Sequence, residues 1–171
     1  MHSRLWLFAA MVTGVRRLLF CAALVVVWCL VSSDAAAQMR SVRSNRVNFR
    51  QAPAAEAAVL FTADQHYPVL VLERKRGWAK IRDFEGEIAW VAERLLTSQK
   101  TVAVIAKGVS ARQQPNDEAP ASFQAPWSEG FVVVRVASDW VLVQDADNRQ
   151  GWIHRMFLWG SVPAYKPPAQ P

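Results

Sequence analysis

Histidines and carboxylates are the first residues to consider for chemistry, because they serve as acids, bases and metal ligands. After residue 40 the chain has two histidines, His66 and His154, and neither has a cysteine or another histidine at a metal-ligand spacing. Residues 83–87 and 145–147 are rich in carboxylates but lack the pattern of a calcium-binding loop. We therefore expect no catalytic residue, no metal site and no cofactor. A hydrolase that depends on His66 or His154 is the remaining enzymatic alternative.

Tryptophans are better candidates for a binding surface, because they offer a large apolar face with a polar edge. The alternation of Ala79 and Ile81 with Trp78 and Lys80 puts Trp78 on the polar face of its predicted strand, whereas the same reasoning leaves Trp90 ambiguous. The predicted ligand-binding residues are Trp78, Trp140, Trp90, Trp152, Phe49 and Arg50. In the alternative interpretation, these tryptophans only pack the interior.

Basic side chains are concentrated in residues 40–98, which contain ten basic and seven acidic residues. Such a surface could attract the carboxylates of cell-wall stem peptides or anionic envelope polymers. In the alternative interpretation, these are ordinary solvated positions. We expect no nucleic-acid partner, because the aromatic and basic residues form no recognised RNA-binding motif.

The first 37 residues have the composition of an export signal. A basic segment precedes the apolar run 18–31, which is followed by the small residues of an A-x-A site at 35–37. The run is shorter than the ~20 apolar residues that a membrane span needs. We predict cleavage before Gln38, from a start at Met1 or Met11, and a periplasmic or secreted protein that meets the membrane only through this segment. An uncleaved membrane anchor is the alternative.

Composition then limits how the exported part can be stabilised. The chain is 52% hydrophobic and 20% charged, which excludes a disordered tail or a collagen. Both cysteines, Cys21 and Cys29, lie in the apolar run, so residues 38–171 can form neither a disulfide nor a thiolate metal site. Packing alone must stabilise them.

The chain repeats itself at an offset of 62 residues. When residues 47–96 are laid on residues 109–158 without a gap, 13 of 50 positions are identical. Trp78 then pairs with Trp140 and Trp90 with Trp152, and tryptophan is too rare for two such identities to be expected by chance. The sequence therefore predicts a duplicated unit of ~50 to 60 residues, a size that can just bury its own core.

Short β-branched and aliphatic runs indicate strands, and no segment after residue 40 sustains a helical period. The runs 67–72 and 131–136 are each followed by a tight polar break and a second run, 78–82 or 140–143. Short strands at this spacing are typical of a small barrel or sandwich. We expect barrels, because a small unit cannot leave long strand edges exposed without inviting association.

Three short motifs in each unit resemble the bacterial SH3-like (SH3b) domain, whose pattern is roughly V-N-x-R-x-x-P, G-W-x-x-V and G-W-V. The motifs lie at residues 47–53, 77–81 and 89–91, and again at residues 109–115, 139–143 and 151–153. The resemblance covers about residues 42–159. It implies an all-β protein of two tandem small SH3-like barrels, and the pair also resembles tandem SH3-like proteins exported by Gram-negative bacteria.

The resemblance and the turns together give a predicted domain organisation. A signal peptide occupies residues 1–37, the two SH3-like domains occupy residues 40–98 and 99–160, and a proline-rich tail follows at residues 161–171. The linker at 97–100 is too short for independent tumbling, so the barrels are expected to pack side by side.

The function that the resemblance implies is binding without catalysis. Some bacterial SH3-like domains bind cell-wall peptides and others bind proteins. We expect an exported module that recognises peptidoglycan or a peptide in the cell envelope. The alternative is a scaffold or accessory subunit of an envelope enzyme or receptor, with the aromatic residues wholly structural.

Overall fold

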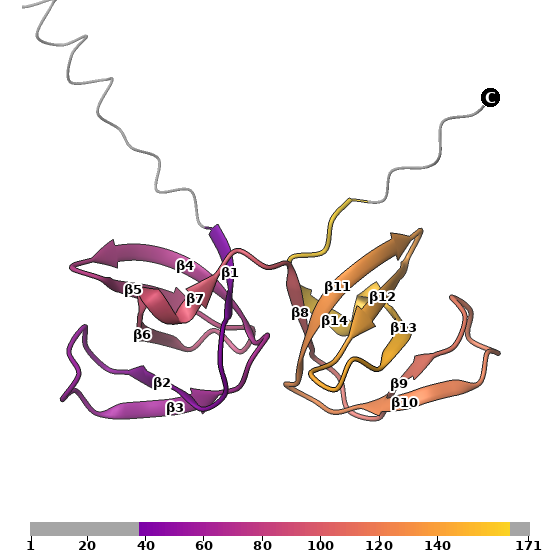
Figure 1. Ribbon diagram of the computed structural model, residues 1–171, viewed down its shortest axis with the longest axis horizontal. Coiled ribbons are helices and arrows are strands. Elements are labelled where there is room, and N and C mark those ends of the chain that lie inside the picture. The colour runs from indigo at the N-terminus through magenta and orange to yellow at the C-terminus, as the bar shows by residue number, and fades with distance from the viewer. Residues whose placement is uncertain (1–37, 165–171) are drawn as a thin grey trace, which may run out of the picture. The chain divides into compact units, whose positions relative to one another are not determined.

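The computed structural model describes residues 38–164. These residues form two seven-stranded antiparallel sheets, each wrapped around its own core, which we call barrel 1 and barrel 2 (Figure 1). The predicted all-β class and the two tandem small barrels are confirmed. The predicted export signal and the last seven residues of the predicted tail lie outside the described residues. None of the helices within residues 38–164 is long and apolar enough to span a membrane.

Barrel 1 contains seven strands and one short 3-10 helix. They are β1 (Gln38–Val42), β2 (Val47–Arg50), β3 (Val59–Ala63), β4 (Pro68–Lys75), β5 (Trp78–Arg82), β6 (Ile88–Ala92), η1 (Glu93–Leu95) and β7 (Leu96–Thr97). The strand order in the sheet is β3-β2-β6-β5-β4-β1-β7.

Barrel 2 has the same elements in the same succession. They are β8 (Thr101–Val104), β9 (Val109–Arg112), β10 (Ala121–Ala125), β11 (Gly130–Ala137), β12 (Trp140–Gln144), β13 (Gln150–His154), η2 (Arg155–Phe157) and β14 (Leu158–Gly160). The strand order is β10-β9-β13-β12-β11-β8-β14, so every strand corresponds to the one seven places earlier.

The two barrels also share their irregularities. The pairing of β4 with β5 shifts register between Val71 and Glu73, and that of β11 with β12 shifts between Val133 and Arg135, at the same place in the repeat. A bulge bends the strand that contains it, so both sheets curl at the same point. The predicted duplication therefore extends from sequence identities to details of the backbone.

The turn that precedes Trp78 fixes where that side chain lies. Arg76 and Gly77 have φ angles of 49° and 80° and connect Lys75 to Trp78, which are paired across β4 and β5. A two-residue turn with both φ angles positive matches the twist of a hairpin, and glycine adopts it without a Cβ penalty. Trp78 is therefore the first residue of β5.

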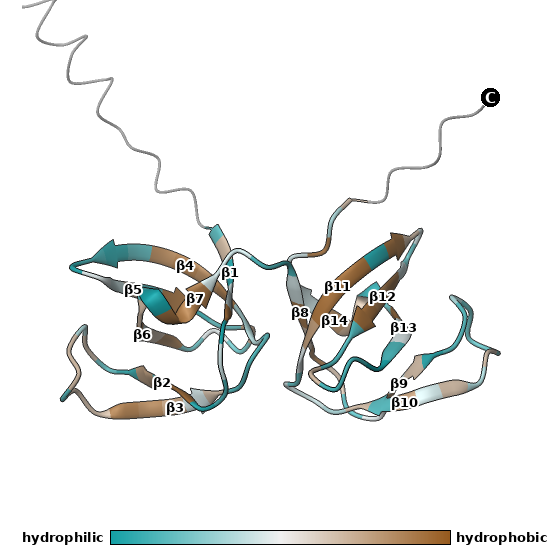
Figure 2. Cartoon of the chain, in the orientation of Figure 1, coloured by the Kyte–Doolittle hydropathy of each residue, from teal (hydrophilic) through white to brown (hydrophobic). Residues whose placement is uncertain are grey.

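Each barrel has a separate hydrophobic core made by alternate residues of its strands. In barrel 1 the centre is formed by fully buried Phe49, Ile81 and Val91, and in barrel 2 Phe131 and Ile153 are fully buried. Figure 2 shows that β4 changes from apolar to hydrophilic toward its end, whereas β11 remains largely apolar with one hydrophilic interruption. The two outer surfaces therefore differ although the cores correspond.

Candidate functional site

Barrel 1 carries a groove beside Trp78, which we call the Trp78 groove. Its volume is about 430 Å³. The start of β5, the end of β6 with η1, and β2 with its flanking loops all contribute to it. Its lining includes Arg46, Asn48, Arg50, Trp78, Ala92 and Arg94.

Strand alternation turns Trp78 toward this groove. Ala79 and Ile81 are fully buried in the core, whereas Trp78 and Lys80 are half-buried on the opposite face of β5. This confirms the orientation expected from the sequence. The partner of Trp78 on β6 is Ala92, whose side chain is a single methyl group, so the indole has open space on that side.

The charged side chains that line the groove are all basic. Arg46, Arg50 and Arg94 belong to the lining, and no aspartate or glutamate does. Arg46 and Arg94 are exposed, whereas Arg50 is half-buried. A guanidinium presents a planar fork of donors that matches a carboxylate, so the groove is suited to an anionic group beside an apolar one.

Arg50 also has a structural task. Its Nη1 donates a hydrogen bond to the carbonyl oxygen of Ala57 at 2.6 Å, and in barrel 2 Arg112 Nη1 donates to the carbonyl oxygen of Ala119 at 2.8 Å. Each arginine thus holds the long loop that follows its own strand. The arginine of the first repeated motif is therefore a loop clamp in both barrels, and in barrel 1 it lines the groove as well.

Trp90 lies outside the lining of the groove but on an adjoining surface. Ala89 and Val91 are buried, so Trp90 is on the outer face of β6, half-buried. Its cross-strand partners are Lys80 on one side and Arg50 on the other. This resolves the ambiguity that the sequence left for Trp90.

The prediction that Phe49 binds ligand is wrong. Its side chain is fully buried and stacks on Phe61 with ring centroids 4.6 Å apart. A residue with no exposed surface cannot contact a ligand at the surface, so Phe49 is a core residue. The indication in the sequence was that apolar Val47 and Phe49 alternate with polar Asn48 and Arg50, which puts both apolar side chains on one face of β2.

The two tryptophans predicted in barrel 2 pack against side chains of their own barrel, and Trp140 is half-buried, as Trp78 is. The ring of His154 meets Trp140 edge-on at 5.4 Å between centroids. The guanidinium of Arg135 lies 5.1 Å from the ring centroid of Trp152, which is only 6% exposed. The structure thus brings Trp78 and Arg50 together in one groove with Trp90 beside it, and it leaves Trp140 and Trp152 packed against neighbours.

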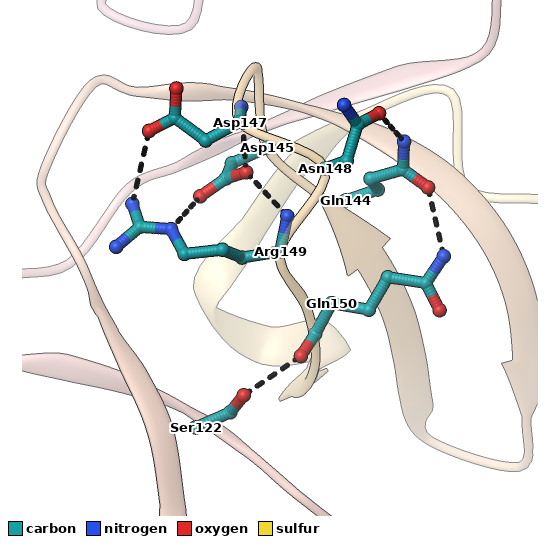
Figure 3. Close-up of polar contacts among 7 residues, drawn as sticks. All are labelled: Ser122, Gln144, Asp145, Asp147, Asn148, Arg149 and Gln150. Atoms are coloured by element: carbon teal, nitrogen blue, oxygen red, sulfur yellow. Dashed lines mark hydrogen bonds and ion pairs between the residues drawn. The ribbon is translucent and has the colours of Figure 1, made fainter.

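The carboxylate-rich turns have a structural use in both barrels. Asp145 Oδ1 accepts backbone hydrogen bonds from Asp147 at 2.9 Å and Arg149 at 2.8 Å, and its Oδ2 pairs with Arg149 Nε at 2.6 Å (Figure 3). Asp83 Oδ1 closes the corresponding turn of barrel 1 in the same way. Within residues 38–164 no three histidine or carboxylate side chains gather as a metal site.

Sequence reasoning missed a group of aromatic residues that joins the barrels. The ring of Phe84 lies 5.5 Å from that of Trp127 and 6.4 Å from that of Trp159. Tyr67 lies 6.1 Å from Phe84, and its hydroxyl donates to Asp83 Oδ2 at 3.3 Å. Burial, with Asp83 beside it, raises the pKa of the Tyr67 hydroxyl far above its ordinary value.

The backbones also approach closely at this contact. A Cβ added to Gly130 would lie 2.5 Å from the carbonyl carbon of His66, so the close approach requires glycine. The expectation that the barrels pack side by side agrees with these contacts. The available indication was that Phe84, Trp127 and Trp159 break the repeat, because their counterparts Ala146, Gln65 and Thr97 are not aromatic.

Comparison with known proteins identifies the family of each barrel. A family model described as a bacterial SH3 domain matches residues 45–97, and a second model of the same description matches residues 106–160. A comparison with curated proteins finds no match.

Two solved structures share a weak likeness with the chain. NlpC1 from Trichomonas vaginalis is 14% identical with a TM-score of 0.34, over 74% of this chain and 47% of that one. NlpC2 from the same organism is 13% identical with a TM-score of 0.34, over 74% of this chain and 49% of that one. The chain therefore spans about half the length of these two proteins. The two family matches, in the same order as the two barrels, show that the chain belongs to the bacterial SH3 domain family and carries two such domains in tandem.

Proposed function

We propose that this protein is a non-catalytic binding module of the cell envelope that recognises peptidoglycan or a peptide. The observation that carries the proposal is the Trp78 groove, in which a half-buried indole lies among arginines on a bacterial SH3 domain. An indole face can take an apolar part of a peptide, and the arginines can take its carboxylates. The envelope location is part of the proposal and rests on the export signal expected at residues 1–37.

The histidines support binding over catalysis. His66 is 8% exposed, so its ring is withdrawn from the surface. His154 packs on Trp140, and its Nδ1 accepts the backbone N–H of Met156 at 3.3 Å, where η2 begins. A hydrolase would therefore need to expose the buried ring of His66 or to release His154 from these contacts.

Co-sedimentation with purified peptidoglycan tests the proposal. We expect the purified protein to sediment with the polymer, and Trp78→Ala to weaken retention by about tenfold or more, because central tryptophans dominate binding interfaces. Trp78→Phe keeps an aromatic face and should retain most of the binding. Circular dichroism checks that both variants are folded. No retention of the wild-type protein would refute peptidoglycan recognition.

A second candidate function is that of an accessory subunit that binds a protein. It is favoured by exposed apolar side chains on barrel 1, since Val59 is 45% exposed and Leu60 and Ile88 are each 49% exposed. Val59 and Leu60 lie on β3, an edge strand, and edge strands offer unpaired backbone groups to partners. A stoichiometric protein captured from a periplasmic extract, lost on Leu60→Asp and without retention on peptidoglycan, would select this function.

A further inference from the structure

We infer that only barrel 1 binds the ligand, and that its cations recognise carboxylate groups of the ligand. The corresponding surface of barrel 2 is closed by side chains of barrel 2 itself. This inference rests on the proposed function and assigns its site and ligand chemistry. It follows from a comparison of three cross-strand pairs on the outer face of β5 and β6 with the same pairs on β12 and β13.

The first pair consists of the first tryptophan of each repeat and its cross-strand partner, and it differs in the space left beside the indole. Trp78 faces Ala92 in barrel 1, and Trp140 faces His154 in barrel 2. The His154 ring occupies the edge of Trp140 at 5.4 Å, whereas Ala92 leaves that side of Trp78 to the groove. Both indoles are half-buried, but one position in the repeat separates a ring whose edge is open from a ring whose edge is covered.

The second pair decides whether the other tryptophan is reachable. Lys80 faces Trp90, and Leu142 faces Trp152. Next along the same row barrel 2 has Arg135, whose guanidinium lies over Trp152, and barrel 1 has Glu73 at that position. Trp152 is buried as a result, whereas Trp90 is half-buried.

The third pair shows the same difference in polar side chains. In barrel 2 Gln144 faces Gln150, and its Oε1 accepts from Gln150 Nε2 at 2.8 Å while its Nε2 donates to Asn148 at 2.8 Å (Figure 3). In barrel 1 the pair is Arg82 with Ile88, and both are exposed. Within residues 38–164 Arg82 forms no ion pair. Barrel 2 thus satisfies its own polar groups at this edge, and barrel 1 presents a cation and an apolar side chain.

The charges identify the ligand chemistry. The groove residues Arg46 and Arg94 correspond to Gly108 and Met156 in barrel 2, and Lys80 corresponds to Leu142. Residues 40–98 have ten basic and seven acidic side chains, whereas residues 99–160 have six of each. Apart from Arg50, which has Arg112 as its counterpart, the cations around the groove are therefore specific to barrel 1. Guanidinium groups on an open groove recognise carboxylates by charge and by paired hydrogen bonds, so a carboxylate-bearing peptide fits.

The test compares two forms of purified peptidoglycan, one native and one whose carboxyl groups have been converted to methylamides. We expect the wild-type protein to bind the native form about tenfold more tightly than the amidated form, because hydrogen bonds to charged groups contribute more than neutral ones. Equal binding to both forms would overturn carboxylate recognition and leave the proposed function standing. Binding to neither form would overturn both.

Variants that exchange residues between the repeats test which barrel binds. Ala92→His places an imidazole against Trp78, as barrel 2 does against Trp140, and should weaken binding by about tenfold. Ala92→Ser is the matched control and should bind as wild type does. His154→Ala uncovers the edge of Trp140 and should leave binding within about twofold of wild type, because barrel 2 has no counterpart of the cations Arg46, Lys80 and Arg94.

Arg94→Met keeps the test valid if Ala92→His fails to fold. Arg94→Met carries the residue of barrel 2 at an exposed position, so it should fold normally and still weaken binding to native peptidoglycan. If the folded Ala92→His variant and the Arg94→Met variant both bind native peptidoglycan as tightly as the wild-type protein does, the assignment to barrel 1 is overturned. If His154→Ala is the only one of these variants that loses binding, the ligand belongs to barrel 2 and the assignment to barrel 1 is overturned as well.

Discussion

The imidazole of His154 packs edge-on against the indole of Trp140, with 5.4 Å between ring centroids. The corresponding residues of barrel 1, Ala92 and Trp78, are paired in the same register, but the alanine is too small to cover the ring. Duplication gave both barrels the same tryptophan in the same strand. The side chain across from it determines whether the edge of that indole is open or covered.

Removal of the loop clamps should loosen the loops that they hold. Arg50→Ala eliminates the 2.6 Å hydrogen bond to the Ala57 carbonyl, and Arg112→Ala eliminates its counterpart to Ala119. Each substitution should reduce the free energy of unfolding by about 1.5 to 3 kcal/mol, the range for a hydrogen bond from a charged donor. Urea denaturation measures this loss. Arg82→Ala, at an exposed position, is the control and should change stability little.

Limited proteolysis locates the effect of the same substitutions. Faster cleavage within residues 51–58 of Arg50→Ala, and within residues 113–120 of Arg112→Ala, is expected. If both variants resisted protease and urea as the wild-type protein does, the clamps would have no structural role.

The contact between barrels should make them unfold together. Phe84 of barrel 1 packs against Trp127 and Trp159 of barrel 2. Phe84→Ala removes this aromatic contact, so the single calorimetric transition expected of the wild-type protein should broaden or split into two. Ile88→Ala, an exposed apolar substitution, is the control and should keep one transition. An unsplit transition at an unchanged temperature in Phe84→Ala would contradict coupling through this residue.

Stability should fall as the pH is lowered past the ordinary pKa of histidine, because of His66. Its Nδ1 is buried without a hydrogen-bond partner among the described residues, and burial lowers the pKa of the ring below its ordinary value of 6.5. The unfolded chain therefore binds a proton at a pH at which the folded chain does not, so stability is lost as the pH falls below 6.5 toward the lowered pKa.

Urea midpoints at about pH 7.5 and about pH 5.5 measure this dependence. His66→Asn should reduce the difference between the two midpoints, because asparagine does not titrate. Asparagine is also suited to the positive φ of 72° at this position. If the difference between the two urea midpoints is the same in the wild-type protein and in His66→Asn, groups other than His66 control the pH dependence of stability.

Much of the fold was predictable from the sequence, because its determinants are local or repeated. Identities at one offset predicted two like units, and the alternation of Ala79 and Ile81 predicted that Trp78 faces outward. Trp90 could not be oriented in this way, since Ile88, Ala89, Trp90 and Val91 are all apolar and the strand shows no polar face. Phe49 was assigned to the site although it shares a strand face with apolar Val47, which indicated the core.

The site itself depends on relationships that lie outside any single strand. The openness of Trp78 depends on Ala92 from another strand, and the coverage of Trp152 depends on Arg135, whose position follows a bulge. Phe84 and Trp127 meet only because the two barrels pack together. Residues that the repeats share, such as Trp78 and Trp140, do not distinguish the two surfaces. The positions at which they differ, 92 with 154 and 73 with 135, separate the two surfaces.

The most direct test of the account compares Trp78→Ala with Trp140→Ala in binding to purified native peptidoglycan. Both substitutions remove the same side chain from the same strand position of a bacterial SH3 barrel, so general effects on folding are matched. We predict that the half-saturating peptidoglycan concentration rises by about tenfold or more for Trp78→Ala and stays close to wild type for Trp140→Ala. Equal losses, or a loss for Trp140→Ala alone, would contradict an open site on barrel 1 and a closed one on barrel 2.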